Sequence, residues 1–145
     1  MCYSIYLSTT SEEDLSVLPS TLFRFIPATE DYDVEILSLL DHPARWHLEC
    51  QYGGCICHFR HLGEGSDLGF APPADWCPED DDDIESTKAA YDVIAHILAG
   101  GHKLDLVDVW TDAKAAEVTT LDVSLSEVQR DSFRFFENRK FMLSL

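Results

Sequence analysis

Several short segments of the chain alternate apolar and polar residues, which is the pattern of a half-buried β-strand. These segments are residues 2–8, 22–26, 104–110, 121–123 and 141–145. In segment 104–110 the two polar residues, Asp105 and Asp108, fall on opposite faces. That placement indicates either a bulge or a strand that is buried on both sides.

Other segments have helical spacing or helix-capping residues. We expect helices in residues 11–18, 31–40, 84–98 and 124–137. The third is the most regular, because Ile84, Tyr91, Ile94 and Leu98 form a stripe along one side. The two glycines that follow it supply a stop signal.

Residues 46–61 alternate on both sides of Gly53-Gly54, and this predicts a β-hairpin, since glycine accepts the positive φ of a tight turn. In that register Glu49 lies opposite His58. The apolar face then carries Trp46, Leu48, Cys50, Tyr52, Cys55, Cys57, Phe59 and His61. The polar face carries His47, Glu49, Gln51, Ile56, His58 and Arg60.

This order of elements predicts an α+β fold. We expect a single domain, residues 1–145, in two layers. One layer is a mixed, largely antiparallel sheet, and three to four helices pack against it. The hydrophobic fraction of 46% is ample for a core of this kind.

The sequence also bears on the location of the protein. No apolar run approaches the roughly 20 residues that span a membrane, and the N-terminal residues lack the features of a signal peptide. We therefore expect a cytoplasmic protein without membrane association. The five cysteines would be thiols in that reducing compartment.

The net charge limits the classes of partner that the protein can bind. The chain has 27 acidic and 10 basic residues, for a formal net charge of -17. Such a field repels phosphate backbones and anionic lipids, so direct nucleic-acid binding is not expected. It favours a basic protein partner or a cation, and a compact acidic protein can also imitate nucleic acid toward a protein that binds it.

The cysteines allow three interpretations. Cys50, Cys55 and Cys57 lie on the apolar face of the predicted hairpin, where a free cysteine acts as a small hydrophobic residue. With Cys77 they could instead form a zinc site, although the spacing departs from the usual knuckle. A Cys50–Cys57 disulfide would fit the hairpin geometry but not a reducing compartment.

Two further groups of residues could carry chemistry. His47, Glu49 and His58 share the polar face and could bind a divalent metal, or they could form ordinary cross-strand pairs. Cys57 with His58 or His61 could serve a small hydrolase or transferase. A core-facing Cys57 argues against that activity, because a nucleophilic thiol needs access.

Residues 62–78 form a long segment rich in glycine and proline, and long loops of this kind are often functional. The aromatic residues Phe70 and Trp76 must either pack on the core or form a binding patch. The acidic run 79–83 follows, and it precedes the most regular helix. We take Phe70, Trp76, Asp80 and Asp81 as candidate binding residues.

The chain contains no nucleotide-binding, nucleophile-elbow or zinc-protease motif. We therefore expect a non-catalytic protein-interaction module without a cofactor, which binds a basic partner. The alternatives are a zinc- or thiol-dependent protein built on the cysteines and the small hydrolase or transferase.

Overall fold

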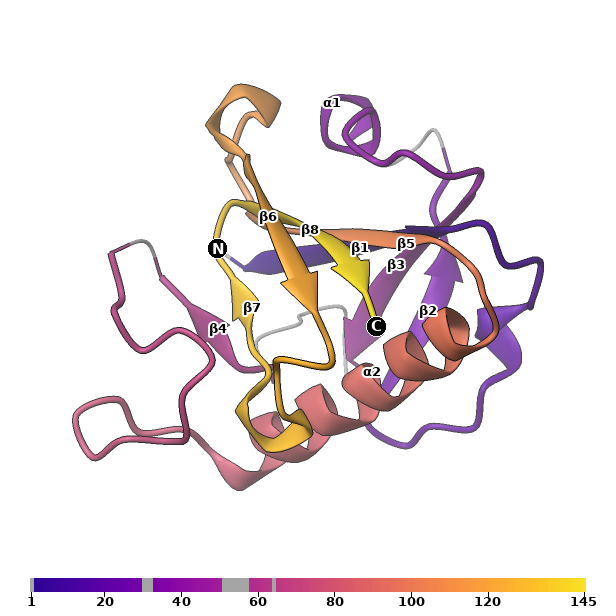
Figure 1. The fold of residues 1–145 in the computed structure, drawn as a ribbon. Helices are drawn as coiled ribbons and strands as arrows, with labels where there is room; N and C mark the ends of the chain where they lie inside the picture. The colour runs from indigo at the N-terminus through magenta and orange to yellow at the C-terminus, as the bar shows by residue number, and fades with distance from the viewer. Residues whose placement is uncertain (1, 30–32, 51–57, 64) are drawn as a thin grey trace.

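The computed structural model describes residues 2–29, 33–50, 58–63 and 65–145. Its centre is a six-stranded sheet with the order β2-β3-β1-β5-β8-β6, in which β6 and β8 are parallel and the other neighbours antiparallel (Figure 1). The strands are β1 (Tyr3–Thr9), β2 (Phe23–Pro27), β3 (Ala44–Cys50), β5 (Leu104–Trp110), β6 (Thr119–Ser124) and β8 (Arg139–Ser144). A second, two-stranded parallel sheet pairs β4 (His61–Leu62) with β7 (Phe135–Phe136).

Helices are fewer than the sequence predicts, so the expected α+β fold with three to four helices on a sheet is wrong. In the described ranges only α1 (Val34–Leu37) and α2 (Asp81–Ala99) are α-helices, and α1 has four residues. Single 3₁₀ turns, Leu15–Val17 and Arg130–Ser132, form in two of the segments expected to be helical. The protein is mostly sheet.

Burial explains the lost C-terminal helix. Phe133 and Phe135 alternate along the chain and are both fully buried, and Phe135 pairs with β4. A helix would have placed these two rings on different sides of the segment. The burial of two large aromatic side chains therefore overrides the local capping signal at Ser124.

The predicted hairpin register is also wrong. β3 is flanked on both sides, because Leu48 pairs with Ile5 of β1 and with Phe25 of β2. No edge of β3 is left for residues 58–61, and His61 instead begins β4. The expected Gly53-Gly54 turn lies outside the described residues.

The facing of β3 follows the sequence pattern. Trp46, Leu48 and Cys50 are all buried in the larger hydrophobic cluster, as alternation predicts. His47 is buried too, because the opposite face of the sheet is covered as well. Alternation thus gave the side on which each residue lies but not the strands beside it.

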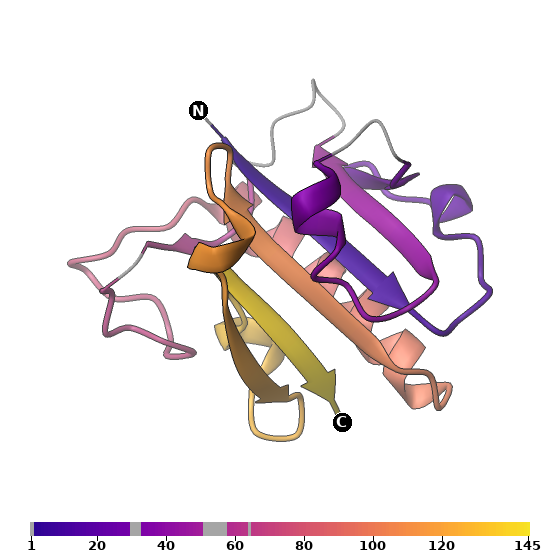
Figure 2. The same cartoon turned by 90° about the horizontal axis from the view of Figure 1, so that it is seen from above.

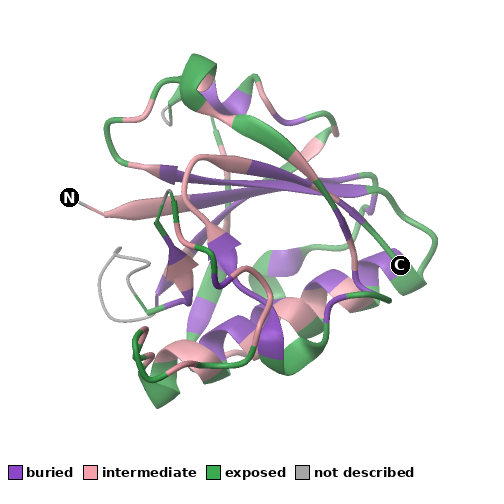
Figure 3. Cartoon of the chain, turned by 60° about the vertical axis from the view of Figure 1, so that its left-hand side comes forward, coloured by how far each residue is buried: buried purple, intermediate pink, exposed green. Residues whose placement is uncertain are grey.

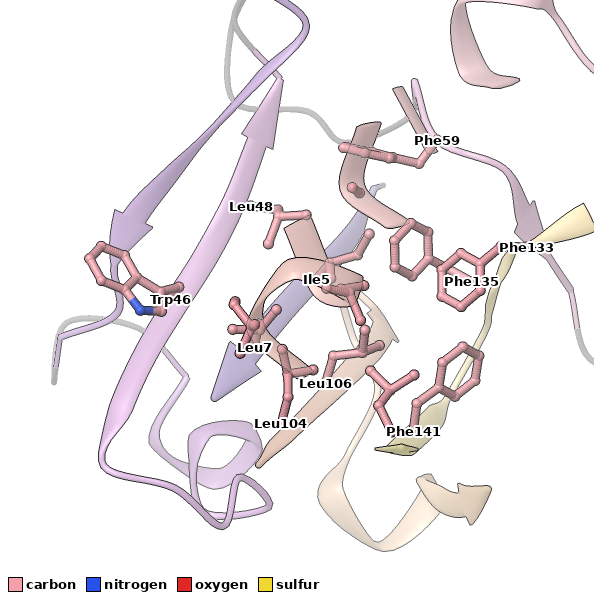
Figure 4. Packing of buried hydrophobic residues seen from close by; sticks show 14 of the residues in the cluster. Ile5, Leu7, Trp46, Leu48, Phe59, Leu104, Leu106, Phe133, Phe135 and Phe141 are labelled. Atoms are coloured by element: carbon pink, nitrogen blue, oxygen red, sulfur yellow. The ribbon is translucent and has the colours of Figure 1, made fainter. Parts of the chain in front are cut away.

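The larger core lies between the sheet and α2. Ile5, Leu7, Leu104 and Leu106 point from the two central strands into it (Figure 4). α2 contributes Ala90, Ile94, Ile97 and Leu98. Figure 3 shows the central strands almost entirely buried, whereas α2 is buried only along its inner side.

A smaller cluster covers the other face. Ile36, Leu37 and Leu40 pack on Tyr6, Val107 and Val109. α1 and α2 therefore lie on opposite sides of the sheet, as the views in Figures 1 and 2 agree. β5 runs between these two layers, which is the physical reason that it is buried on both faces.

α2 begins at Asp81, within the acidic run that was expected to precede it. Asp80 is the N-cap, and three aspartates occupy the first turn, where they interact favourably with the exposed N–H groups of the helix. At its other end Gly101 has φ of 82°, a conformation that favours glycine. Within the described part of the chain, neither helix has the length and apolar character that crossing a bilayer requires.

Candidate functional site

A cleft of about 310 Å³ opens where β4 and the first turn of α2 meet the ends of β1 and β5. Tyr3 and Trp110 pair across β1 and β5 at this end of the sheet, and both line the cleft. His61 from β4 and Asp83 from α2 supply the facing walls. The cleft therefore collects side chains that are far apart in the sequence.

A buried histidine–aspartate pair lies at this cleft. Nδ1 of His61 is 2.8 Å from Oδ2 of Asp108, and these side chains are 5% and 0% exposed. The His61 ring stacks on Tyr3 with centroids 4.1 Å apart and planes at 6°, and Trp110 meets Tyr3 edge-on. Stacking and the carboxylate together fix the imidazole in one orientation.

Two acidic groups that line the cleft have raised pKa values, and burial is the main cause of both shifts. Burial, together with the charges of Glu137 and Asp108, raises the pKa of Tyr3 to about 12. Burial and the charge of Asp80 raise the pKa of Asp83, although His58 and His61 act in the opposite direction. Both shifts have the sign expected where negative charge is concentrated and partly desolvated.

Beside the cleft, Glu79 joins two buried arginines. Its carboxylate accepts two hydrogen bonds from Arg60, both 2.8 Å, and two from Arg134, of 2.7 and 2.9 Å. Both guanidinium side chains are fully buried. Burial favours the neutral carboxyl group, but the arginines outweigh it and lower the pKa of Glu79 to about 2.

The remaining donors of these arginines hold neighbouring segments together. Nη1 of Arg60 donates to the carbonyls of Asp131 and Phe133 at 2.7 and 3.3 Å. Nη1 of Arg134 donates to the carbonyls of Gly69, at 3.0 Å, and Ala71. The cluster thereby fixes part of the long segment 62–78 and the approach to β7, and these frame the cleft.

A second buried polar centre lies on the α1 side of the sheet. Asp105 accepts hydrogen bonds from the Ser8 hydroxyl and, at 3.0 Å, from the backbone N–H of Asp41. The ammonium group of Lys140 lies 3.2 Å from Asp105 and 2.8 Å from the Asp41 carboxylate. Burial would lower the pKa of Lys140, but these two carboxylates raise it. The centre is closed and structural.

The proposed zinc ligands are only partly described, since Cys55 and Cys57 lie outside the described residues. Cys50 is a buried free thiol that interacts with the backbone of His58, and its burial raises its pKa. Of the three interpretations of the cysteines, a Cys50–Cys57 disulfide is therefore excluded, because Cys50 is a free thiol. Cys77 is a free thiol that lines the cleft, in a short turn with Ala74.

The proposed histidine–glutamate set is not assembled as predicted. Glu49 pairs with Arg24 at 3.0 Å and lies 3.5 Å from His47. His58 instead lies 3.6 Å from Asp83. Burial lowers the pKa of His47. Over the described ranges, no three His, Cys, Asp or Glu side chains are grouped so that they could hold a metal ion.

Of the third candidate site, with Cys57, His58 and His61, Cys57 lies outside the described residues. Its two histidines have separate partners, Asp83 for His58 and Asp108 for His61. The pairing of His61 with Asp108 was not predicted from the sequence. The signal was present in part, since an aspartate facing the core of an apolar strand needs a polar partner.

The four candidate binding residues separate into two kinds. Phe70 packs inward, with its ring 4.7 Å from Phe136. Trp76 is 66% exposed. Asp80 and Asp81 are exposed at the start of α2. An exposed tryptophan, followed within a few residues by exposed carboxylates, is thus what remains of the predicted binding patch.

Comparison with known proteins gives no match: no family model, no curated protein and no solved structure matches the chain. The chemistry available is that of aromatic walls beside carboxylates, which suits an organic cation.

Proposed function

We propose that the protein is a non-catalytic interaction module that binds a basic protein partner. The observation that carries the proposal is the exposed Trp76, which shares a surface segment with carboxylates at the start of α2. We name this segment the acidic rim; its residues are Asp75, Trp76, Asp80, Asp81 and Asp82.

Most of the basic residues form ion pairs within the chain, and this supports the proposal. At least six of the ten lysine and arginine side chains are in ion pairs with carboxylates of the same chain. Arg60, Arg134 and Lys140 are buried. Since these cations contribute little at the surface, the outward-facing charge is strongly acidic, which attracts a basic partner and repels an acidic one.

Trp76 adds what charge alone lacks. Large aromatic side chains are frequent anchors in protein interfaces, and the face of an indole ring attracts arginine and lysine. The acidic rim would therefore attract arginine in two ways, through the charge of its carboxylates and through the face of the Trp76 ring. A partner segment with alternating arginine residues would satisfy both.

The test is the affinity of a labelled peptide of alternating arginine and glycine, measured by fluorescence anisotropy. We expect Trp76→Ala, and separately the triple change Asp80→Asn, Asp81→Asn and Asp82→Asn, to weaken binding about tenfold or more. Raising the salt concentration from about 0.05 to about 0.5 M should weaken wild-type binding as well.

A matched control neutralises three exposed carboxylates elsewhere: Asp112→Asn, Asp122→Asn and Glu127→Gln. This variant loses the same net charge. If it weakens binding as much as the acidic-rim triple variant, the attraction is only a property of net charge and the proposal fails. It also fails if the wild-type protein does not bind the peptide at low salt.

A further inference from the structure

The cleft adjoins the acidic rim, although its lining is different. Cys77 and Pro78, which follow Trp76 directly in the chain, line the cleft, and Asp83 follows Asp82 in the first turn of α2. A partner segment lying along the acidic rim would therefore pass the mouth of the cleft. This adjacency raises the question of what the partner would place inside it.

The size of the cleft limits the answer. A volume of about 310 Å³ is at the lower end of the range, roughly 300–1,000 Å³, that small-ligand sites occupy. It suits one long side chain rather than a folded element. Tyr3, Phe59 and Trp110 supply aromatic surface for the aliphatic part of such a side chain and π-faces for a charged end.

The charges in and around the cleft select a cation. Asp83 lines the cleft, and the buried Asp108 lies behind His61. Arg60 also lines it, but each of its three guanidinium nitrogens already donates to Glu79 or to a backbone carbonyl. The nearby imidazoles of His58 and His61 already face the carboxylates of Asp83 and Asp108. An anionic group would therefore meet carboxylates whose neighbouring cations already have partners.

We propose that this cleft binds the side chain of one arginine of the basic partner, with its guanidinium group at Asp83 and its stem against Tyr3 and Trp110. The inference rests on the proposed function, because it names the residue by which the same partner would be recognised. Arginine fits better than lysine, since a planar guanidinium group both stacks on aromatic rings and pairs with a carboxylate through two N–H groups.

The raised pKa values of Tyr3 and Asp83 agree with this assignment. Each reports that negative charge is disfavoured at these positions in the free protein. A bound guanidinium group would relieve that repulsion, whereas a neutral ligand of the same shape would not.

The experiment compares two peptides that differ at one central position, which is either arginine or citrulline. Citrulline has nearly the same shape but no charge. Each peptide is titrated into wild-type protein, Asp83→Asn and Trp110→Leu, with Asp112→Asn as the matched control, and circular dichroism checks the fold of each variant. We expect wild type and the control to prefer arginine about tenfold, and Asp83→Asn to remove that preference.

The outcomes separate the cleft from the acidic rim. If Trp76→Ala weakens binding of both peptides while Asp83→Asn leaves the arginine preference intact, the proposed function stands and the cleft inference is overturned. The peptide titration is paired with a titration of N-acetylarginine amide, followed by NMR shifts of the His61 ring. Binding of that amide to wild type but not to Asp83→Asn supports the cleft inference even if the acidic rim proves unnecessary. The cleft inference is overturned if wild type neither binds the amide nor prefers the arginine peptide.

If Trp110→Leu unfolds the protein, Asp83→Asn still decides the matter. Asp83 is partly exposed in the first turn of α2, so Asp83→Asn keeps the size of the side chain and loses only the favourable interaction of a carboxylate with the helix N-terminus. Asp83→Asn and the Asp112→Asn control each remove one negative charge, so the two variants have the same net charge. A difference between these two variants therefore reports position and not total charge.

Discussion

Asp105 and Asp108 lie three residues apart on β5 and are both fully buried, but their surroundings differ. Asp105 lies under α1, where a hydroxyl, a backbone N–H and an ammonium group surround it. Asp108 lies on the α2 side, where Oδ2 meets His61 and Oδ1 has no hydrogen-bond partner among the described residues. Two identical side chains on one strand thus make a closed structural centre and a polar group beside a cleft.

Asp105 and Asp108 differ in how completely their buried carboxylates are hydrogen-bonded. A buried carboxylate that is fully hydrogen-bonded fixes the structure around it. One that keeps an unpaired oxygen has a cost that surrounding packing must offset. The unpaired oxygen of Asp108 lies beside the cleft at the end of β1 and β5, where we propose that a ligand binds.

The largest effect should come from breaking the closed centre. Asp105→Asn would remove the buried carboxylate beside Lys140, which is 8% exposed, and leave its ammonium group only the more exposed Asp41 as a counter-charge. We expect the free energy of unfolding, measured by urea denaturation, to fall by about 3–5 kcal/mol. Asp112→Asn, an exposed change on a neighbouring segment, should alter it by less than about 0.5 kcal/mol. A similar small change in Asp105→Asn would show that the Ser8–Asp105–Lys140 centre does not carry stability.

Glu79 sharpens the comparison, because it is closed like Asp105 but lies beside the cleft. Its pKa in the folded protein is about 2, below its ordinary value of 4.5. A lowered folded-state pKa stabilises the protein above pH 4.5, and this contribution is lost as the pH falls toward 2. The shift corresponds to about 3 kcal/mol.

Urea unfolding of wild type and Glu79→Gln between pH 7 and about pH 3 tests this effect. The variant should be less stable at neutral pH, and the gap between the two proteins should narrow as the pH falls. A gap that stays constant with pH would mean that ionisation of Glu79 is not the source of the difference.

A smaller loss is expected for Asp108→Asn. The amide keeps the shape and can still bond to His61, and Oδ1 of the native carboxylate already lacks a partner. We expect a loss of about 1–3 kcal/mol, less than for Asp105→Asn measured in the same denaturant. If Asp108→Asn costs more than Asp105→Asn, the contrast between the open and the closed centre is wrong.

The smallest effect on stability belongs to the acidic rim. Trp76 is 66% exposed, so Trp76→Ala should change the free energy of unfolding by less than about 0.5 kcal/mol. The same variant should lose affinity for the arginine–glycine peptide. Phe70→Ala is the opposite case, because Phe70 packs on Phe133 and Phe136, and it should destabilise the protein. Thermal unfolding of the two variants distinguishes a binding residue from a core residue.

The sequence predicted local structure where one periodic pattern dominates. α2 and β5 fall where their apolar stripe and apolar run placed them, and burial of Asp105 and Asp108 on opposite faces followed from their spacing. The hairpin failed for a specific reason: alternation fixes the facing of Leu48 but not whether Ile5, Phe25 or Phe59 lies beside it. Strand pairing depends on the whole sheet, so the pattern of one segment does not determine which strands lie beside it.

The cleft could not be predicted because its parts come from distant positions. Tyr3, His61 and Trp110 meet only after β1 pairs with β5 and β4 packs across their ends. Trp76 and the carboxylates after it could be proposed as a binding patch from the sequence because they are neighbours in the chain, and that proposal stays a prediction. Local chemistry was therefore visible in the residues, whereas chemistry assembled by topology required the fold.

The position of β8 between β5 and β6 has a consequence for biosynthesis. β6 emerges from the ribosome before β8, but among the strands described it meets the sheet only through β8. Until residue 144 has cleared the exit tunnel, β6 has no template and the side of β5 that β8 covers stays open. A nascent chain should therefore leave this side of the sheet exposed until β8 has emerged, and chains that stall before β8 should need chaperone protection and be prone to degradation.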